Sequence, residues 1–202
     1  MAKTWDDFLP LLSPHLNDCP NATMKEYLAI VASDFFARTY LWREQIDAIY
    51  VTSGTVEYDL DADAVVEDVI SVIHNDLPLD RTDLRLVATQ NLGQKGDPRE
   101  FWVNADRSIF IAPVPEERSV FKVYAVLKPS RTGSGVEDWI YETWADTLVS
   151  GTVARLAMIP NKEWTDVAMA TTQKAIYERA ITTARIRDFR GINLMVRQRP
   201  IA

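Results

Sequence analysis

The hydrophobic positions of this chain change their period twice along its length. Between residues 24 and 35 they recur at helical spacing, and Thr23 and Glu26 have the spacing of a capping box. From Gln45 onwards, apolar residues alternate with polar ones, which is typical of strands with one solvated face. After the Gly- and Ser-containing segment 130–135 the helical spacing returns. The pattern therefore predicts helices, then strands, then helices again.

Several strands are predicted in the middle of the chain. In the stretch 55–63, Val56, Tyr58 and Leu60 alternate with acidic residues. Further segments are rich in β-branched and aromatic residues and are separated by Asp, Pro, Gly and Asn. These segments are 67–75, 84–90, 99–104, 107–115 and 119–129. They predict an antiparallel sheet or a small sandwich inserted between helices.

The last two predicted helices form a hairpin with a sharp corner. The first helix runs in from Trp139 and ends before Pro160, because proline lacks an amide hydrogen and disfavours helical geometry in the preceding residue. Thr165 is expected to cap the second helix, with Trp164 as a hydrophobic staple before it. We therefore predict a structural corner at Pro160, Trp164 and Thr165. The second helix is expected to pack through a row of small residues at intervals of four: Ala168, Thr172, Ile176, Ala180 and Ala184.

Together these elements predict an α+β fold in a single domain. N-terminal helices (1–44) and a C-terminal helical hairpin (131–190) are expected to form a helical bundle, with the β region (45–130) inserted as one sheet or sandwich. Residues 191–202 show no helical period, so we expect them to form an extended tail. A chain of 202 residues buries about 70% of its unfolded surface, which suffices for a substantial core.

Charge is distributed unevenly between the two halves of the chain. Residues 1–80 carry 15 acidic and 4 basic side chains, whereas residues 81–202 carry 14 acidic and 18 basic ones. An acidic first half argues against wrapping of nucleic acid by that surface, because affinity for phosphates depends on Lys and Arg.

No apolar run approaches the roughly 20 residues of a membrane-spanning helix, and the N-terminus is acidic where a secretory signal is basic. We therefore expect a soluble protein made in cytoplasm.

The sequence contains no recognisable metal or catalytic motif. Cys19 has no second cysteine to pair with, and two histidines are too few for most histidine-based metal sites. The acidic series that begins at Asp59 resembles the start of a calcium loop, but Ala64 and Ile70 occupy the positions where that loop needs Gly and Glu. His74 lies in a predicted strand with no second histidine nearby, which favours a structural role. We therefore expect no enzyme activity and no cofactor.

The order of several segments resembles that of the head-to-tail adaptor (connector) proteins of tailed bacteriophages. The most specific is the hairpin GTVARLAMIPNKEWTD at 151–166, because members of that family show a small-residue helix, a proline stop and a tryptophan before the next helix. The other segments, in chain order, are SDFFARTYLWRE, VEYDL, GDP before FWV, APVP and LKPSR. The resemblance spans nearly the whole chain.

This resemblance implies a structural virion protein of the phage neck. It implies a homo-oligomeric ring, expected to hold about twelve subunits, that binds the portal on one side and tail or nozzle proteins on the other. DNA would pass through the ring without sequence-specific binding, and the family has no catalytic residues to carry over. The protein would be made in the host cytoplasm and located in the virion, between capsid and tail.

Two surfaces of such a ring have candidate residues. Acidic side chains facing the channel would repel phosphates and let the duplex slide, although the same residues could simply keep an outer sheet face soluble. These acids are Glu57, Asp59, Asp61 and Asp63. The tail could dock on the portal or on a neighbouring subunit, or it could be a disordered end. Its candidate contact residues are Leu194, Val196, Arg197 and Arg199.

Two other functions stay open at this point. One is a different tail-completion or neck protein that forms a ring of other symmetry. The other is a small hydrolase or ligand-binding domain with a site built from acidic residues and tryptophans. An enzyme should have a deep pocket with perturbed titrating groups, whereas an adaptor should have large flat interfaces.

Overall fold

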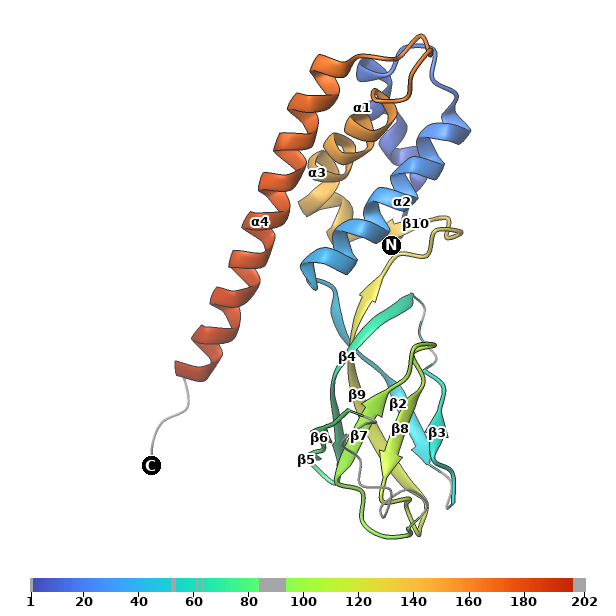
Figure 1. Cartoon of the computed structure of the whole chain (residues 1–202), viewed down its shortest axis with the longest axis vertical. Helices are drawn as coiled ribbons and strands as arrows, with labels where there is room; N and C mark the ends of the chain where they lie inside the picture. The colour runs from blue at the N-terminus through green and yellow to red at the C-terminus, as the bar shows by residue number, and fades with distance from the viewer. Residues whose placement is uncertain (1, 52–53, 61, 63, 84–93, 198–202) are drawn as a thin grey trace. The chain divides into compact units, whose positions relative to one another are not determined.

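The chain divides into two compact units. The computed structural model describes residues 2–51, 54–60, 62, 64–83 and 94–197. The first unit, here called the helical unit, combines Met1–Leu41 with Lys128–Ala202, and the second, the β unit, is Trp42–Leu127 (Figure 1). The β unit is thus inserted into the helical unit in the sequence. Its two ends lie next to each other, because the Leu127 amide donates a hydrogen bond of 2.7 Å to the Trp42 carbonyl.

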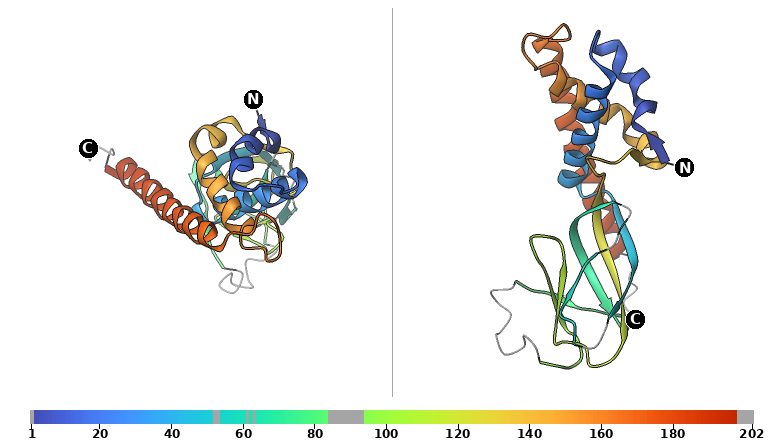
Figure 2. Two further views of the ribbon diagram at one scale, coloured as in Figure 1. Left: turned by 90° about the horizontal axis from the view of Figure 1, so that it is seen from above. Right: turned by 90° about the vertical axis from the view of Figure 1, so that its right-hand side faces the viewer.

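The helical unit is built around three long helices. Figure 2 shows α2, α3 and α4 side by side, and a short antiparallel pair of strands, β1 and β10, joins residues near the N-terminus to the start of α3. The elements are β1 (Ala2–Thr4), η1 (Trp5–Phe8), α1 (Leu9–Leu12), η2 (Ser13–His15), α2 (Asn21–Thr39), β10 (Gly135–Glu137), α3 (Asp138–Leu156) and α4 (Val167–Arg197).

The three long helices approach one another closely at Gly151. A β-carbon built on Gly151 in α3 would lie 2.6 Å from Val31 Cγ1 in α2 and 2.8 Å from Tyr177 Cδ2 in α4. Such distances are far inside van der Waals contact, so only glycine fits here. Around this point Phe35 and Leu148 are fully buried. The position therefore determines how near the helix axes can come.

The β unit contains two four-stranded sheets in its described part. The first has the order β2 (Arg43–Val51), β9 (Ser119–Lys128), β4 (Val65–His74) and β5 (Leu77–Pro78). The second has the order β3 (Glu57–Tyr58), β8 (Ile109–Ala112), β7 (Glu100–Val103) and β6 (Asp80–Arg81), and β6 runs parallel to β7. Along β9, Phe121, Val123 and Ala125 are buried and the residues between them are exposed. Period-two alternation thus places one side of this strand in the core.

The predicted fold class needs correction. A helical bundle with one inserted sheet and an extended tail was wrong, because the described residues form three sheets, and one of them, β1–β10, belongs to the helical unit. The predicted tail is also wrong up to Arg197, since α4 continues to that residue. Gly191 costs a helix only about 1 kcal/mol, and a helix that has already formed propagates readily through it. Residues 198–202 and the predicted strand 84–90 lie outside the described residues.

The packing face of α4 also differs from the prediction. Ala168, Thr172 and Ile176 are exposed. Because an α-helix has about 3.6 residues per turn, steps of four residues rotate by about 40° each, so a strict row of this kind winds off any one face. The buried residues follow mixed steps of three, four and seven: Ala170, Tyr177, Ile181 and Ala184.

Candidate functional site

The corner between α3 and α4 is held by side-chain hydrogen bonds. The Thr165 hydroxyl donates to the Ile159 carbonyl at 2.6 Å and accepts from the Lys162 amide at 3.0 Å. The Asp166 carboxylate accepts from the Met169 amide at 2.9 Å in the first turn of α4. Asp166 therefore caps the helix, and Thr165, which was predicted to do so, closes the turn before it. The two residues are adjacent and both suited to capping, so local propensity does not separate them.

Trp164 lies at this corner and is half-buried. The Lys162 ammonium lies 5.9 Å from the centre of the indole ring, in the range of a cation–π contact. The indole Nε1 is buried and has no hydrogen-bond partner among the described residues. Pro160, the third predicted corner residue, is exposed in the turn. The structure thus places all three predicted corner residues in one short connection between the helices.

A charged cluster links the three long helices next to Gly151. Arg38 in α2 donates two hydrogen bonds to the Glu178 carboxylate in α4, at 2.9 and 2.5 Å. Asp34 in α2 accepts from the Tyr177 hydroxyl at 3.2 Å and pairs with Arg155 of α3 at 3.1 Å. The bonds from Arg38 lower the pKa of Glu178, whereas burial, followed by the nearby Asp34 charge, raises the pKa of Tyr177. These groups satisfy one another, so the cluster acts as a cross-link of the helical unit.

Two of the four predicted channel acids, Glu57 and Asp59, lie among the described residues. Glu57 is exposed in the two-residue strand β3 and accepts a hydrogen bond of 2.8 Å from the Ser108 hydroxyl. Asp59 is exposed just after that strand. Asp61 and Asp63 lie outside the described residues. Whether Glu57 and Asp59 face a channel stays a prediction.

The predicted tail contacts belong to a different backbone conformation. Leu194, Val196 and Arg197 lie in α4, whereas Arg199 is outside the described residues. The amides of these three residues belong to the last turn of α4 and are directed at carbonyls of the preceding turn, so in this conformation they cannot donate to a neighbouring sheet. A docking role for these residues therefore has to use side chains.

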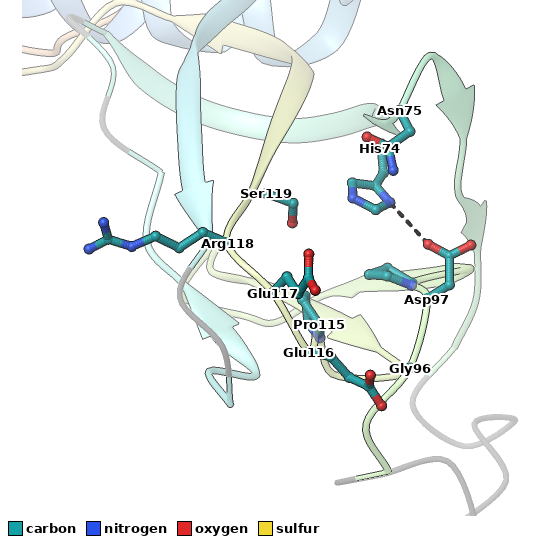
Figure 3. Close-up of a pocket in the computed structure, with 10 residues that line it drawn as sticks. His74, Asn75, Gly96, Asp97, Pro115, Glu116, Glu117, Arg118 and Ser119 are labelled. Atoms are coloured by element: carbon teal, nitrogen blue, oxygen red, sulfur yellow. Dashed lines mark ion pairs between the residues drawn. The ribbon is translucent and has the colours of Figure 1, made fainter.

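The β unit contains a polar cleft of about 370 Å³ (Figure 3). Three separate stretches of the chain meet there: the end of β4, the loop before β7 and the connection from β8 to β9. The lining residues are His74, Asn75, Gly96, Asp97, Pro98, Pro115, Glu116, Glu117, Arg118 and Ser119. Its volume is at the lower end of the range of roughly 300–1,000 Å³ that is usual for ligand pockets.

A tight turn and a stacked ring fix the position of His74. Asn75 and Asp76 have positive φ angles of 49° and 61°, which residues of these types tolerate in a two-residue hairpin turn. The His74 ring stacks on Phe121 at 4.6 Å with an interplanar angle of 13°, and its side chain is 8% exposed. Its Nδ1 atom lies 3.5 Å from a carboxylate oxygen of Asp97. The imidazole is thus held between an aromatic ring and an acid.

Backbone hydrogen bonds hold the loop that carries Asp97. The Gly96 amide donates to the Val114 carbonyl at 2.9 Å, and the Arg99 amide donates to the Ala112 carbonyl at 3.0 Å. These bonds anchor the loop on both sides of Asp97 against the end of β8. Figure 3 shows the Asp97 carboxylate directed at the His74 ring from that loop. The His74–Asp97 pair is therefore built into the fold.

Two polar atoms in this cleft lack partners. His74 Nε2 and Ser119 Oγ are buried, and neither has a hydrogen bond to any residue that the structure describes. Nδ1 faces the acceptor Asp97, so in the neutral ring it is Nδ1 that carries the proton and Nε2 that accepts. Because Nε2 and Ser119 Oγ do not bond to each other, the pair lacks the contact by which a histidine activates a serine. The cleft is suited to binding a hydrogen-bond donor.

Sequence reasoning assigned His74 a structural role and missed this cleft. The residues that meet there are far apart along the chain, and no spacing rule connects position 74 with positions 97 and 119. The one local signal for the cleft is the acidic pair Glu116–Glu117, which follows a proline in a loop. Such acidic pairs are common on protein surfaces, so the signal is weak. Only the pairing of strands brings these groups together.

The described residues contain neither a membrane-spanning helix nor a cluster of metal ligands. No helix in the described part of the chain is long and apolar enough to cross a membrane. Within the same residues, no group of three or more His, Cys, Asp and Glu is placed to hold a metal ion. No protein-family model and no curated protein matches the chain. Function therefore has to be argued from the order of the elements and from the geometry.

Proposed function

We propose that this protein is a head-to-tail adaptor of a tailed bacteriophage, which forms a ring between the portal and the tail and continues the DNA channel. The proposal starts from the ordered segments that resemble this family, above all the hairpin at 151–166. Pro160, Trp164 and Thr165 lie together in the connection between α3 and α4. This placement supports the resemblance at the segment that is most specific for it.

The length of α4 is the observation that carries the proposal. This helix has 31 residues and its hairpin partner α3 has 19, which corresponds to about 46 Å against about 28 Å. Figure 1 shows that α4 runs antiparallel to α3 and continues beyond the point where α3 begins. Ile186 on this part of α4 is 48% exposed, and apolar residues continue in the sequence at 189, 192 and 194–196. A helix end of this composition is suited to packing against another subunit.

The β unit also presents apolar side chains to solvent. Tyr50 in β2 and Val120 in β9 are register partners, and their side chains are 80% and 45% exposed. Leu77 in β5 of the same sheet is 68% exposed. A sheet with exposed aromatic and aliphatic residues favours contact with another protein surface. In a ring, each subunit should bury well over about 2,000 Å² against its neighbours.

The proposed role requires no chemistry from the chain. The ring would hold about twelve subunits to match the portal, and it would contact tail or nozzle proteins on its far side. Exposed acids such as Glu57 and Asp59 would lower the affinity of a channel wall for phosphates, so DNA would pass without sequence-specific binding. The site of action would be the neck of the virion, with no enzyme activity and no cofactor.

Electron microscopy of the protein mixed with the portal encoded by the same genome tests this proposal. We expect an ordered ring on the portal. Ile186→Asp should prevent ring formation without changing the melting temperature, because it places a charge in the proposed interface. Thr171→Asp, a change at an exposed position near the start of α4, is the control and should still assemble. A protein that never associates with the portal would refute the proposal, and a ring found only on the tail would assign it to another neck component.

A further inference from the structure

We propose that the cleft around His74 binds an arginine side chain, and that this arginine comes from the basic C-terminal segment of a second copy of the chain. The proposal rests on the proposed ring, in which copies lie next to one another. It gives a function to the buried, unpartnered His74 Nε2 and Ser119 Oγ atoms. It also names the contact that would join neighbouring subunits at the β unit.

The unpartnered atoms of the cleft call for a hydrogen-bond donor. In the neutral ring with the Nδ1 proton directed at Asp97, His74 Nε2 is an acceptor, and Ser119 Oγ can accept as well. Carboxylates of Asp97 and Glu116 on the same lining offer further acceptors. A guanidinium carries five N–H donors and no acceptor in a planar arrangement, so it complements this lining better than an anion or an amide does.

The charge of the cleft favours the same ligand. Its lining carries three carboxylates, on Asp97, Glu116 and Glu117, against one cation, Arg118. Figure 3 shows the Arg118 side chain directed away from His74 and from the other lining groups. Arg118, the one basic residue of the described lining, therefore does not neutralise these carboxylates. A metal ion is a weaker candidate, because no three potential ligands of the described residues are grouped to hold one.

The end of the chain supplies an occupant of matching charge. Residues 186–202 contain four arginines and one acid, Asp188. Arg185 is not counted among them, because its Nε already donates to the Arg38 carbonyl at 2.8 Å. The four arginines are Arg187, Arg190, Arg197 and Arg199. Residues 186–197 of this segment form the end of α4, the part that runs past α3, where the proposed interface between subunits lies (Figure 1).

A peptide-binding experiment tests the chemistry of the cleft. The probe is a fluorescent peptide of residues 186–202, and the recipient is the full chain with its four C-terminal arginines changed to Gln, so that its own segment does not compete. We expect saturable binding that weakens with salt. Glu116→Gln with Glu117→Gln should weaken binding by about tenfold or more, and Ser119→Ala should weaken it less. Glu142→Gln with Asp146→Asn, which also removes two exposed carboxylates but in α3, is the charge-matched control and should bind as before.

Two results would overturn the chemical part of the proposal. One is an affinity that the Glu116 and Glu117 changes leave unaltered. The other is equal binding of a control peptide in which the four arginines are Gln. Glu116 and Glu117 are exposed, whereas Ser119 Oγ is buried, so circular dichroism and melting are measured on each variant to verify that it is folded. A loss of binding with an unchanged melting curve therefore reports on the cleft itself.

Cross-linking between labelled copies tests the source of the arginine. Arg197→Lys and Arg199→Lys keep the charge and introduce the only amines of this segment, which a carbodiimide can couple to Glu116 or Glu117. After mixing isotopically heavy and light chains, we expect heavy–light cross-linked peptides. Cross-links within single chains only would refute the second-copy assignment. If Glu116→Gln and Glu117→Gln leave a portal-bound ring intact, this inference is refuted and the proposed function is not. If heavy–light cross-links form but the protein does not bind the portal, the proposed function is refuted and this inference is not.

Discussion

Gly151 has no side chain, and this lets three helices meet. The nearest atoms to a β-carbon at this position belong to Val31 in α2 and Tyr177 in α4, and both residues are buried. Neither side chain can move outward without opening the core of the helical unit. Close packing of this kind makes a single methyl group matter, because a core that is already full cannot accept added volume without strain.

Gly151→Ala is therefore expected to destabilise the helical unit by about 1–3 kcal/mol, even though alanine is the better helix former by about 1 kcal/mol. The free energy of unfolding from urea titration measures the effect. Gly96→Ala is the matched control, because its β-carbon would meet Pro113 at an ordinary 3.5 Å, and it should stay within about 0.5 kcal/mol. An unchanged stability of Gly151→Ala would mean that the helices are not packed this closely.

Tyr177 gives the helical unit a defined response to alkaline pH. Burial, with Asp34 beside it, raises the pKa of Tyr177 above the ordinary value of 10.0. Above about pH 10 the unfolded chain therefore loses this proton while the folded chain keeps it, so ionisation favours unfolding and stability falls as pH rises. Tyr177→Phe should reduce this loss relative to wild type. Melting temperatures of both proteins between pH 8 and about 11 measure it, and parallel curves would contradict the assignment.

At the scale of elements, the start of α4 depends on one carboxylate. Asp166 accepts the Met169 amide, which otherwise has no partner within the helix. Asp166→Ala is expected to lower the free energy of unfolding by about 1 kcal/mol, and Asp166→Asn should restore most of it because asparagine caps equally well. Chemical denaturation of the three proteins measures the difference. Equal losses for Ala and Asn would show that charge at the helix end, rather than the hydrogen bond, is responsible.

The corner before α4 depends on a different residue. Thr165 bonds to both Ile159 and Lys162, so it joins the end of the α3 segment to the turn that follows. Trp164 is only half-buried, and its removal should therefore cost less than the removal of a fully buried aromatic residue. The corner is thus a turn closed mainly by hydrogen bonds, with the tryptophan packed at its side.

At the scale of the whole molecule, the β unit is an insertion whose ends meet. Trp42 and Leu127 are hydrogen-bonded neighbours, and every described helix belongs to the other unit. Replacing residues 42–127 by a short Gly-Ser linker should therefore leave a folded helical unit, because the loop to be closed is short. Far-ultraviolet circular dichroism and a cooperative thermal transition measure this outcome. A non-cooperative transition would show that the helical unit needs the β unit to fold.

The sequence by itself determined several of the local elements of this protein. The predicted strands at 67–75, 99–104, 107–115 and 119–129 correspond to β4, β7, β8 and β9, and the hairpin does turn in the region of Pro160. These features follow from periodicity, β-branched and aromatic content, and a missing amide hydrogen. Such properties act within a few residues, so they are visible in a single chain segment.

Only the tertiary structure decided which of these elements belong together. Sequence reasoning expected strands only in an inserted sheet or small sandwich, but β1 pairs with β10 across more than a hundred residues and forms a third sheet in the helical unit. The same holds for the cleft, where His74 meets Asp97 from a distant loop. Strand partners and the surroundings of a buried side chain depend on contacts between segments far apart in the chain. Local propensity describes each segment separately, so it does not include the energy of contacts that form only when distant segments pack together.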